Sequence, residues 1–232
     1  MPRKEKVREM FDHIAPTYDK LNHVLSMNVD KRWRRQALRE IVDGSAQRIL
    51  DVACGTGDST ISIAQAAAAG SEVVGVDISE GMMALVEGKA EKAGVGDRIR
   101  LQVADGEELP FEDGSFDRVT CAFGIRNFEH KERGLSEFLR VLKPGGKAVI
   151  LELSVPRNKV VRWAYDLYFT RLLPRIGGAL SGDKAAYRYL PASVHHFPAP
   201  QAFCRMMEDA GFRAVRCRTF TLGLCRLFTG TR

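Results

Sequence analysis

Between residues 48 and 153, short β-rich runs alternate with helical stretches, and this alternation constrains the fold more than any other feature. The expected strands are residues 48–53, 72–77, 99–104, 116–123 and 147–153, and the expected helices are residues 59–69, 79–93 and 131–142. Strands and helices that alternate at this spacing form a parallel sheet with helices on both faces. The sequence therefore predicts an α/β fold with a doubly wound sheet.

The segments outside this alternation complete one predicted domain. A chain of 232 residues is long enough for one domain with a substantial core. We expect residues 1–47 to form a helical cover, 48–154 the ligand-binding core, 155–198 a helical insertion, and 199–232 a terminal helix and two strands.

Composition excludes several classes of protein. Hydrophobic residues make up 45% and charged residues 28%, as in ordinary globular domains. No apolar run approaches the roughly 18–20 residues of a membrane-spanning helix, and the charged start does not look like a secretory signal. The 5 cysteines are scattered without a CxxC pair, so we expect reduced thiols, no metal site and a cytoplasmic protein.

Charge is unevenly distributed along the chain. Residues 1–40 carry 10 basic and 6 acidic side chains, residues 41–156 carry 12 and 19, and residues 157–232 carry 13 and 4. The middle is therefore acidic and the two flanks are basic. Basic flanks attract nucleic acid or anionic lipid headgroups, and composition alone does not choose between these partners.

Polar residues and glycines directly follow four of the expected strands. In doubly wound sheets, ligands bind beyond the carboxyl ends of the strands, where strand order reverses. The turn with Gly55 and Gly57 follows the first strand, Asp77 ends the second, Asp105 follows the third, and residues 124–127 follow the fourth. We expect these groups to converge on one ligand site.

The glycine turn and Asp77 together indicate a ligand that contains a nucleoside. Glycines allow a ligand to approach the backbone without obstruction by a Cβ atom. Asp77 stands twenty residues beyond Gly57, where its carboxylate can accept hydrogen bonds from both ribose hydroxyls. Both NAD and S-adenosylmethionine would satisfy this arrangement.

The neighbouring residues favour S-adenosylmethionine over a dinucleotide. The dinucleotide fingerprint G-x-G-x-x-G needs a third glycine, but Thr60 occupies that position. Asp58 would also bring negative charge towards a pyrophosphate. A pocket with Asp51, Asp58, Asp77 and Asp105 suits instead the positive sulfonium and amino groups of S-adenosylmethionine.

With residues 142–146, these motifs resemble the class I S-adenosylmethionine-dependent methyltransferase fold, a Rossmann-like sheet, mostly parallel, with an antiparallel C-terminal strand. The chain also resembles the ubiquinone/menaquinone biosynthesis C-methyltransferases over nearly its whole length. The segments that carry this second resemblance are residues 10–19, 21–26, 33–35, 123–127, 140–146, 173–177 and 187–190. Two positions depart from the family pattern: Asp30 replaces a frequent His, and Ala122 replaces a Ser found in some members.

The resemblance implies which residues bind the cofactor. The full expected set is Asp51, Gly55, Gly57, Thr60, Asp77, Asp105 and Gly106. Thr60 would hold the cofactor's carboxylate from the first helical turn, where backbone N–H groups are free. Asp105 would accept a hydrogen bond from the adenine amino group.

The reaction implied by the resemblance is C-methylation of a prenylated quinol, most simply demethylmenaquinol to menaquinol. The alternatives are the benzoquinol intermediate of ubiquinone biosynthesis and another small molecule. A ring carbon becomes nucleophilic when the adjacent hydroxyl is deprotonated, so the site must stabilise a phenolate or position a base. Arg126 and Asn127 are the first candidates for this role, followed by Tyr18; His195 and His196 are further candidates.

A prenylated acceptor also implies contact with a membrane surface, because its tail resides in the bilayer. We expect a peripheral protein at the inner face of the cell membrane, with a helix over residues 160–173 guiding the tail. Arg162, Arg171 and Arg175 would dock on anionic lipid. The alternatives are that this helix packs on the sheet and that the arginines only promote solubility. A homodimer is compatible with the sequence.

Other functions remain open from the residues alone. A methyltransferase acting on RNA would need a basic groove with aromatic residues, and the acidic middle segment argues against nucleic acid. A nicotinamide oxidoreductase is disfavoured by Asp58 and Thr60. A non-catalytic cofactor-binding partner in a quinone assembly is the third alternative.

Overall fold

The computed structural model describes residues 4–26, 28–169 and 184–232, and these residues contain one sheet with the strand order β3-β2-β1-β4-β5-β7-β6. The strands are β1 Arg48–Val52, β2 Glu72–Asp77, β3 Ile99–Val103, β4 Phe116–Ala122, β5 Leu142–Leu153, β6 Arg213–Phe220 and β7 Cys225–Thr231. Neighbouring strands from β1 to β5 pair in parallel, whereas β7 is antiparallel to both β5 and β6. The predicted doubly wound sheet with a reversed C-terminal strand is confirmed.

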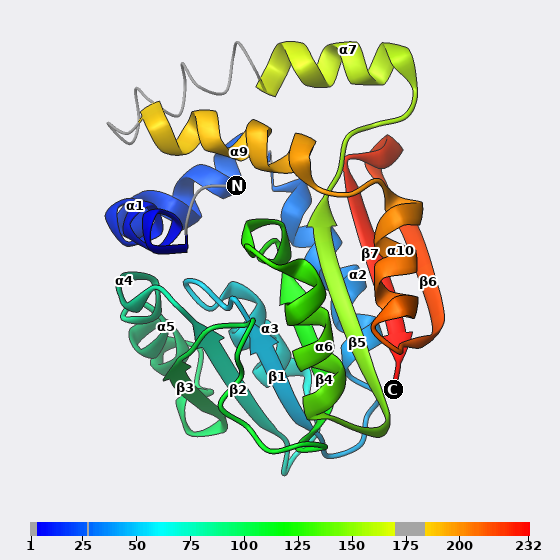
Figure 1. The fold of residues 1–232 in the computed structure, drawn as a ribbon. Helices are drawn as coiled ribbons and strands as arrows, with labels where there is room; N and C mark the ends of the chain where they lie inside the picture. The colour runs from blue at the N-terminus through cyan, green and yellow to red at the C-terminus, as the bar shows by residue number, and fades with distance from the viewer. Residues whose placement is uncertain (1–3, 27, 170–183) are drawn as a thin grey trace.

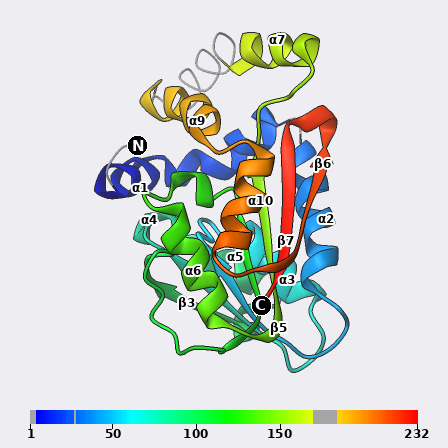
Figure 2. The ribbon, with the colours of Figure 1, turned by 45° about the vertical axis from the view of Figure 1, so that its right-hand side comes forward.

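Helices cover both faces of this sheet (Figure 1). The α-helices are α1 Lys4–Leu25, α2 Val29–Ile41, α3 Asp58–Ala66, α4 Glu80–Met83, α5 Val86–Lys92, α6 Lys131–Val141, α7 Lys159–Leu167, α9 Lys184–His196 and α10 Pro200–Asp209; short 3₁₀ turns are η1 Gly96–Arg98, η2 Ile125–Asn127 and η4 Thr221–Gly223. Helices α2, α3 and α5 cover one face, and α6 and α10 cover the other (Figure 2). Helices α1, α9 and α7 lie beyond the carboxyl ends of the parallel strands (Figure 1).

The strands of the middle of the sheet are apolar on both sides, as is typical of parallel strands that are covered by helices. Successive side chains of a strand point to opposite faces. Ile49 therefore joins the core with Trp33 of α2, while Leu50 joins the core with Phe138 of α6 and Phe203 of α10. Both strand residues are completely buried.

Two predicted helices differ from the structure. The helix expected over residues 59–69 begins at Asp58 and ends at Ala66, and its N-cap is Gly57, which has a left-handed φ of 84°. The helix expected over residues 79–93 is divided into α4 and α5. The Ser79 hydroxyl accepts a hydrogen bond from the Met82 N–H at 3.1 Å and so caps α4.

The last parallel strand begins earlier than predicted. We expected residue 147 as its start, but β5 begins at Leu142, which pairs with Phe116. The next pair joins Lys147 to Arg118, so residues 143–146 bulge out of the ladder. Gly145 adopts a left-handed φ of 78° in this bulge, which gives a structural reason for the Pro-Gly-Gly sequence at residues 144–146.

Helix α7 projects away from the sheet in both ribbon views (Figures 1 and 2). Its side chains Val160 and Trp163 are 75% and 68% exposed. The expectation that this helix packs on the sheet is therefore wrong. Residues 170–183, which include Arg171, Arg175 and the motif at 173–177, lie outside the described residues. In the described part of the chain, no helix has the length and apolar character needed to cross a membrane.

Candidate active site

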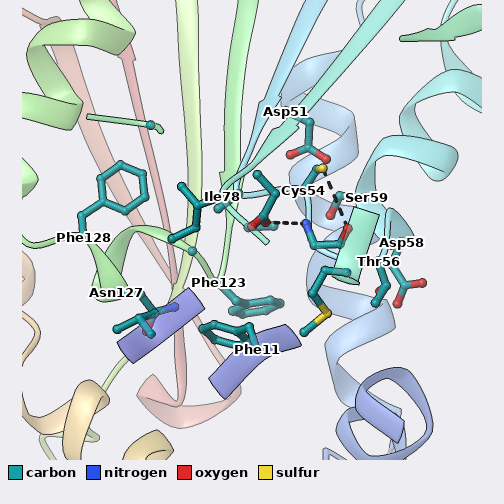
Figure 3. Close-up of a pocket in the computed structure, with 18 of the residues that line it drawn as sticks. Phe11, Asp51, Cys54, Thr56, Asp58, Ser59, Ile78, Phe123, Asn127 and Phe128 are labelled. Atoms are coloured by element: carbon teal, nitrogen blue, oxygen red, sulfur yellow. Dashed lines mark hydrogen bonds between the residues drawn. The ribbon is translucent and has the colours of Figure 1, made fainter. Parts of the chain in front are cut away.

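A pocket lies beyond the carboxyl ends of β1 to β4 and encloses about 1000 Å³ of empty space, its opening to solvent included. Ligands of doubly wound sheets bind at this position, beyond the carboxyl ends of the strands. Its walls come from the loops after these strands and from α1. Figure 3 shows Asp51 and Asp58 at one end, Asn127 and Phe128 at the other, and the rings of Phe11 and Phe123 between them.

The four aspartates singled out from the sequence, Asp51, Asp58, Asp77 and Asp105, all line this pocket. Asp77 is held by two backbone groups: one carboxylate oxygen accepts from the Gly55 N–H at 2.8 Å, and the other accepts from the Ser79 N–H at 2.9 Å. Burial raises the pKa of Asp77, and these hydrogen bonds oppose the shift. Each oxygen keeps a lone pair for a ligand hydroxyl.

Asp51 is the most deeply buried of these acids. Burial raises its pKa to about 6, while a hydrogen bond from Thr60 and the charge of Arg34 act in the opposite direction. The nearby Asp77 carboxylate raises this pKa further. Two carboxylates that disfavour each other's charge are stabilised when a cation binds between them. The acidic end of the pocket therefore favours a positively charged ligand.

Thr60 and Gly57 do not lie among the pocket-lining residues. The Thr60 hydroxyl is completely buried and donates to Asp51 at 2.7 Å, so it holds Asp51 and does not face a ligand. Gly57 abuts α5 instead: a Cβ atom there would lie 2.6 Å from Cγ1 of Val86. In this structure both positions therefore lie behind the pocket wall, and their contact with the cofactor stays a prediction.

Gly55 and Gly106 line the pocket for different reasons. Gly55 has a left-handed φ of 56°, and a Cβ atom there would meet nothing within 4 Å. Its backbone is therefore open to a ligand. A Cβ atom at Gly106 would lie 2.4 Å from Cζ of Phe128. Gly106 thus allows the Phe128 ring to form the adjoining wall.

Two residues other than glycine adopt left-handed conformations at the ends of neighbouring strands. Ala53 follows β1 with a φ of 55°, and Phe123 follows β4 with a φ of 64°; both line the pocket. Each such conformation costs about 1–3 kcal/mol and tends to occur at functional sites. The hydrogen bond from the Phe123 N–H to the Leu151 carbonyl, at 2.7 Å, holds this second turn in place. Nothing in the sequence marked these two residues.

Helix α1 forms the roof of the pocket through one stripe of side chains. Lys4, Val7, Phe11 and Tyr18 all line the cavity, and their spacing of three, four and seven residues keeps them on one helical face. This periodicity was visible in the sequence, but we did not connect it with the pocket.

Polar contacts at Lys4, Asp12 and Asp19 hold α1 to the strand ends. Lys4 pairs with Asp105, and the Asp12 carboxylate accepts from the Ser79 hydroxyl at 2.6 Å. Asp19 pairs with Lys89 at 2.7 Å, and Lys89 also pairs with Asp58 at 2.6 Å. The roof is therefore attached near the ends of β1, β2 and β3.

On the acceptor side, Asn127 and Tyr18 line the pocket but Arg126 does not. The Arg126 guanidinium is buried behind this wall and pairs with Glu152 at 2.9 Å. Burial alone would lower the pKa of Arg126, but Glu152, Tyr18 and Tyr189 together outweigh burial, and the pKa is raised. Direct contact between Arg126 and an acceptor is thus corrected to a buried positive charge behind the wall.

Asn127 has a defined orientation. The Tyr189 hydroxyl of α9 donates to Asn127 Oδ1 at 3.0 Å. Because its carbonyl oxygen is occupied, the Asn127 amide group is left to donate hydrogen bonds. The sequence placed Asn127 at the site but gave no indication of this partner.

The two histidine candidates lie outside the set of pocket-lining residues. His195 Nε2 is 3.4 Å from an Asp166 carboxylate oxygen, and His196 Nδ1 is 2.7 Å from the Ala192 carbonyl oxygen. Among the described residues, no group of three or more His, Cys, Asp or Glu side chains is arranged to hold a metal ion.

The sheet order with one reversed strand, and an acidic pocket at the strand ends, define the class I S-adenosylmethionine-dependent methyltransferase fold. Solved structures with this fold include the [4+2]-cyclase SpnF, with a TM-score of 0.75 and 17% identity, covering 100% of this chain and 97% of that one. Another is phosphoethanolamine N-methyltransferase 2 of Haemonchus contortus in complex with S-adenosyl-L-methionine, with a TM-score of 0.65 and 17% identity, covering 87% of this chain and 52% of that one.

The chain belongs to the ubiE/COQ5 methyltransferase family, whose model matches residues 2–232. A similar relative is the ubiquinone/menaquinone biosynthesis C-methyltransferase UbiE of Geobacter sulfurreducens, 48% identical over 98% of this chain and 89% of that protein. The demethylmenaquinone methyltransferase of Thermus thermophilus is 47% identical over 96% of this chain and 100% of that protein.

Proposed function

We propose that this protein transfers a methyl group from S-adenosylmethionine to a ring carbon of a prenylated naphthoquinol, converting demethylmenaquinol to menaquinol. The observation that carries the proposal is the juxtaposition, in one pocket, of four aspartates with a wall of aromatic rings. The acidic end suits a cationic nucleoside and the aromatic end suits a flat, apolar acceptor. The names of relatives at 42–48% identity support this choice of acceptor.

The acidic end fits the cofactor group by group. Asp77 would accept from the ribose hydroxyls, since its carboxylate is already oriented by Gly55 and Ser79. Asp105 would accept from the adenine amino group, in place of its present partner Lys4. Asp51 would balance the positive end of the molecule. The bound cofactor supplies a methyl group on a positively charged sulfur.

The acceptor end would activate the ring. The Asn127 amide donates to the hydroxyl next to the reacting carbon, and Tyr18 lines the same pocket from the roof. The buried Arg126 cation, fixed by Glu152, lowers the energy of a phenolate in front of it. The rings of Phe11 and Phe123 hold the acceptor against the cofactor, which aligns carbon, methyl and sulfur.

Turnover with two defined acceptors tests this proposal. The protein is incubated with S-adenosylmethionine and either short-chain demethylmenaquinol or the corresponding benzoquinol, and the product is identified by mass. We expect methylated naphthoquinol. Faster turnover of the benzoquinol would show that the preferred acceptor is the intermediate of ubiquinone biosynthesis. Absence of turnover with both acceptors would refute quinol methylation. Equilibrium binding of NADH is the control, and we expect none.

We further propose that α7 contacts the membrane that holds the acceptor. Val160, Trp163 and Leu167 are exposed on one side of this helix. Arg157, Lys159 and Arg162 are exposed on or beside it. Tryptophan with nearby basic residues is typical of helices that lie in the headgroup region of anionic bilayers.

Vesicle binding tests this contact, with Trp163 as its own reporter. Because Trp33 is buried and Trp163 is exposed, a blue shift of fluorescence on addition of phosphatidylglycerol vesicles reports insertion of α7. Trp163→Ser should weaken sedimentation with these vesicles at least fivefold. Val103→Ser, which changes an exposed apolar residue on β3, should not. Equal sedimentation of both variants would refute the proposal.

A further inference from the structure

The hydroxyl of Tyr165, on α7, is buried without a hydrogen-bond partner. The side chain is only 5% exposed, and its oxygen contacts neither solvent nor any polar group of the described residues at hydrogen-bond distance. Buried hydroxyls are almost always paired, because an unpaired one loses its hydrogen bonds to water without replacement. Tyr165 carries the one hydroxyl among the buried polar atoms without a partner in the described residues, and an oxygen of a bound ligand would satisfy it.

The surroundings of Tyr165 fix the ring and leave the hydroxyl available. The Phe169 ring stacks on it with centroids 4.1 Å apart, and His195 meets it edge-on at 6.2 Å. Burial raises the pKa of Tyr165, although the nearby Arg126 charge opposes this shift. The phenol therefore stays protonated and can donate. A guanidinium has only donors, so Arg126 cannot be the partner that accepts from it.

Tyr165 is not among the pocket-lining residues, but the Phe169 ring that stacks on it packs in one cluster with Tyr18, which lines the acceptor end. The charge of Arg126 acts on three tyrosines that come from different helices: Tyr18 of α1, Tyr165 of α7 and Tyr189 of α9. Tyr18 lines the pocket, and the Tyr189 hydroxyl is bound to Asn127. Tyr165 thus belongs to the same group of side chains, on the side of the helix opposite to the exposed Val160, Trp163 and Leu167.

We propose that the Tyr165 hydroxyl hydrogen-bonds the second oxygen of the quinol, the one beside the carbon that carries the tail. This inference rests on the proposed function. A 1,4-diol has two oxygens on opposite sides of the ring, and Asn127 is assigned to the one next to the reacting carbon. Tyr165 then binds the other oxygen. The two hydrogen bonds together orient the ring, and this orientation decides which unsubstituted ring carbon faces the methyl donor. Tyr165 is a substrate-positioning residue and transfers no proton.

A double-mutant cycle tests this assignment, in which the Tyr165 hydroxyl, the second hydroxyl of the substrate, or both are removed. The two acceptors are a short-chain 2-prenyl-1,4-naphthalenediol and 3-prenyl-1-naphthol, which keeps the oxygen next to the reacting carbon but lacks the second one. Tyr165→Phe should lower kcat/KM for the diol about 10-fold and change that for the naphthol less than twofold. A merely structural role would lower both by the same factor and would overturn the inference, as would no loss with the diol.

Binding and stability complete the test. Dissociation constants of both acceptors, measured with S-adenosylhomocysteine present, should show the same selective loss even if the naphthol turns over slowly.

Tyr165→Phe should not lower the Tm, because the hydroxyl has no partner in the free protein; a clear drop would overturn the inference. Tyr168→Phe, at the end of the same helix, should leave both acceptors within twofold. Failure of the wild-type protein to methylate the diol would instead refute the proposed function itself.

Discussion

The Asp77 carboxylate accepts a hydrogen bond from the Gly55 N–H at 2.8 Å, and this contact joins the end of β2 to the turn that follows β1. The two strands run side by side in register, with Val52 opposite Val76. The second oxygen is fixed by Ser79. The carboxylate is therefore oriented before any ligand arrives, which limits the entropy lost on binding.

Asp77→Asn should weaken the binding of S-adenosylmethionine about 100-fold. Hydrogen bonds to a charged group contribute about 1.5–3 kcal/mol each, and the amide loses at least one of them. The measurement is isothermal titration calorimetry. Asp97→Asn, at an exposed site in η1, is the matched control and should bind normally. An unchanged dissociation constant for Asp77→Asn would remove the basis for the cofactor assignment.

Affinity for S-adenosylmethionine should fall as the pH drops through 6. Burial raises the pKa of Asp51 to about 6, so its negative charge is lost below that pH. The same raised pKa acts in the opposite direction on folding. The folded state binds the proton of Asp51 more tightly than the unfolded chain does, so the free energy of unfolding increases as the pH falls from 6 towards 4.

Asp51→Asn is the variant that isolates this effect. It should bind the cofactor more weakly at pH 7 and show no step in affinity between pH 5 and pH 7. The α-amino group of the cofactor stays protonated over this window, so its titration does not contribute to a step. Thr60 can still donate to the amide oxygen, so the fold should persist. A step of unchanged size near pH 6 in the variant would assign the titration to another group.

Gly57→Ala should destabilise the protein by about 2–4 kcal/mol. The new methyl group would lie 2.6 Å from Cγ1 of Val86, and φ is +84°. The double variant with Val86→Ala removes the clash and should recover the part of the loss that the clash causes. Gly88→Ala in α5 is the control, since a Cβ atom there meets nothing within 4 Å. It should stabilise the helix by about 1 kcal/mol, and urea denaturation measures all three.

Glu152→Gln should cost about 3–5 kcal/mol of stability, because it leaves the buried Arg126 cation without its carboxylate. The double variant Arg126→Met with Glu152→Leu should recover most of this loss, since no buried charge then remains. Its turnover should stay low, because the positive charge behind Asn127 is gone. Thermal unfolding and initial rates distinguish these effects, and a fully active double variant would show that Arg126 serves stability alone.

The strand ends could be predicted from the sequence, because each buried parallel strand is a short apolar run that stops at a polar residue or a glycine. Asp77 and Asp105 were placed at the pocket for that reason. The position of Thr60 could not be predicted in the same way, because its hydroxyl donates to Asp51, and the spacing of the two residues in the sequence gave no sign of this hydrogen bond.

Other features depend on partners far away in the chain. Arg126 was expected to face the acceptor, but Glu152 on β5 draws its guanidinium behind the wall. Lys4 meets Asp105 across 101 positions of sequence. Local patterns carry no signal for such pairs, so the roof formed by α1 and the buried cation behind Asn127 emerge only from the three-dimensional arrangement.

The way α1 is fastened has a consequence for the pace of repeated turnover. Its links to the strand ends at Lys4, Asp12 and Asp19 are charged groups near solvent, which exchange for water at small cost. The spent nucleoside must leave before each new cycle begins. Lifting this helix would expose Ile14 and Ala15, which pack against Met82, but it would leave every strand pair of the sheet intact.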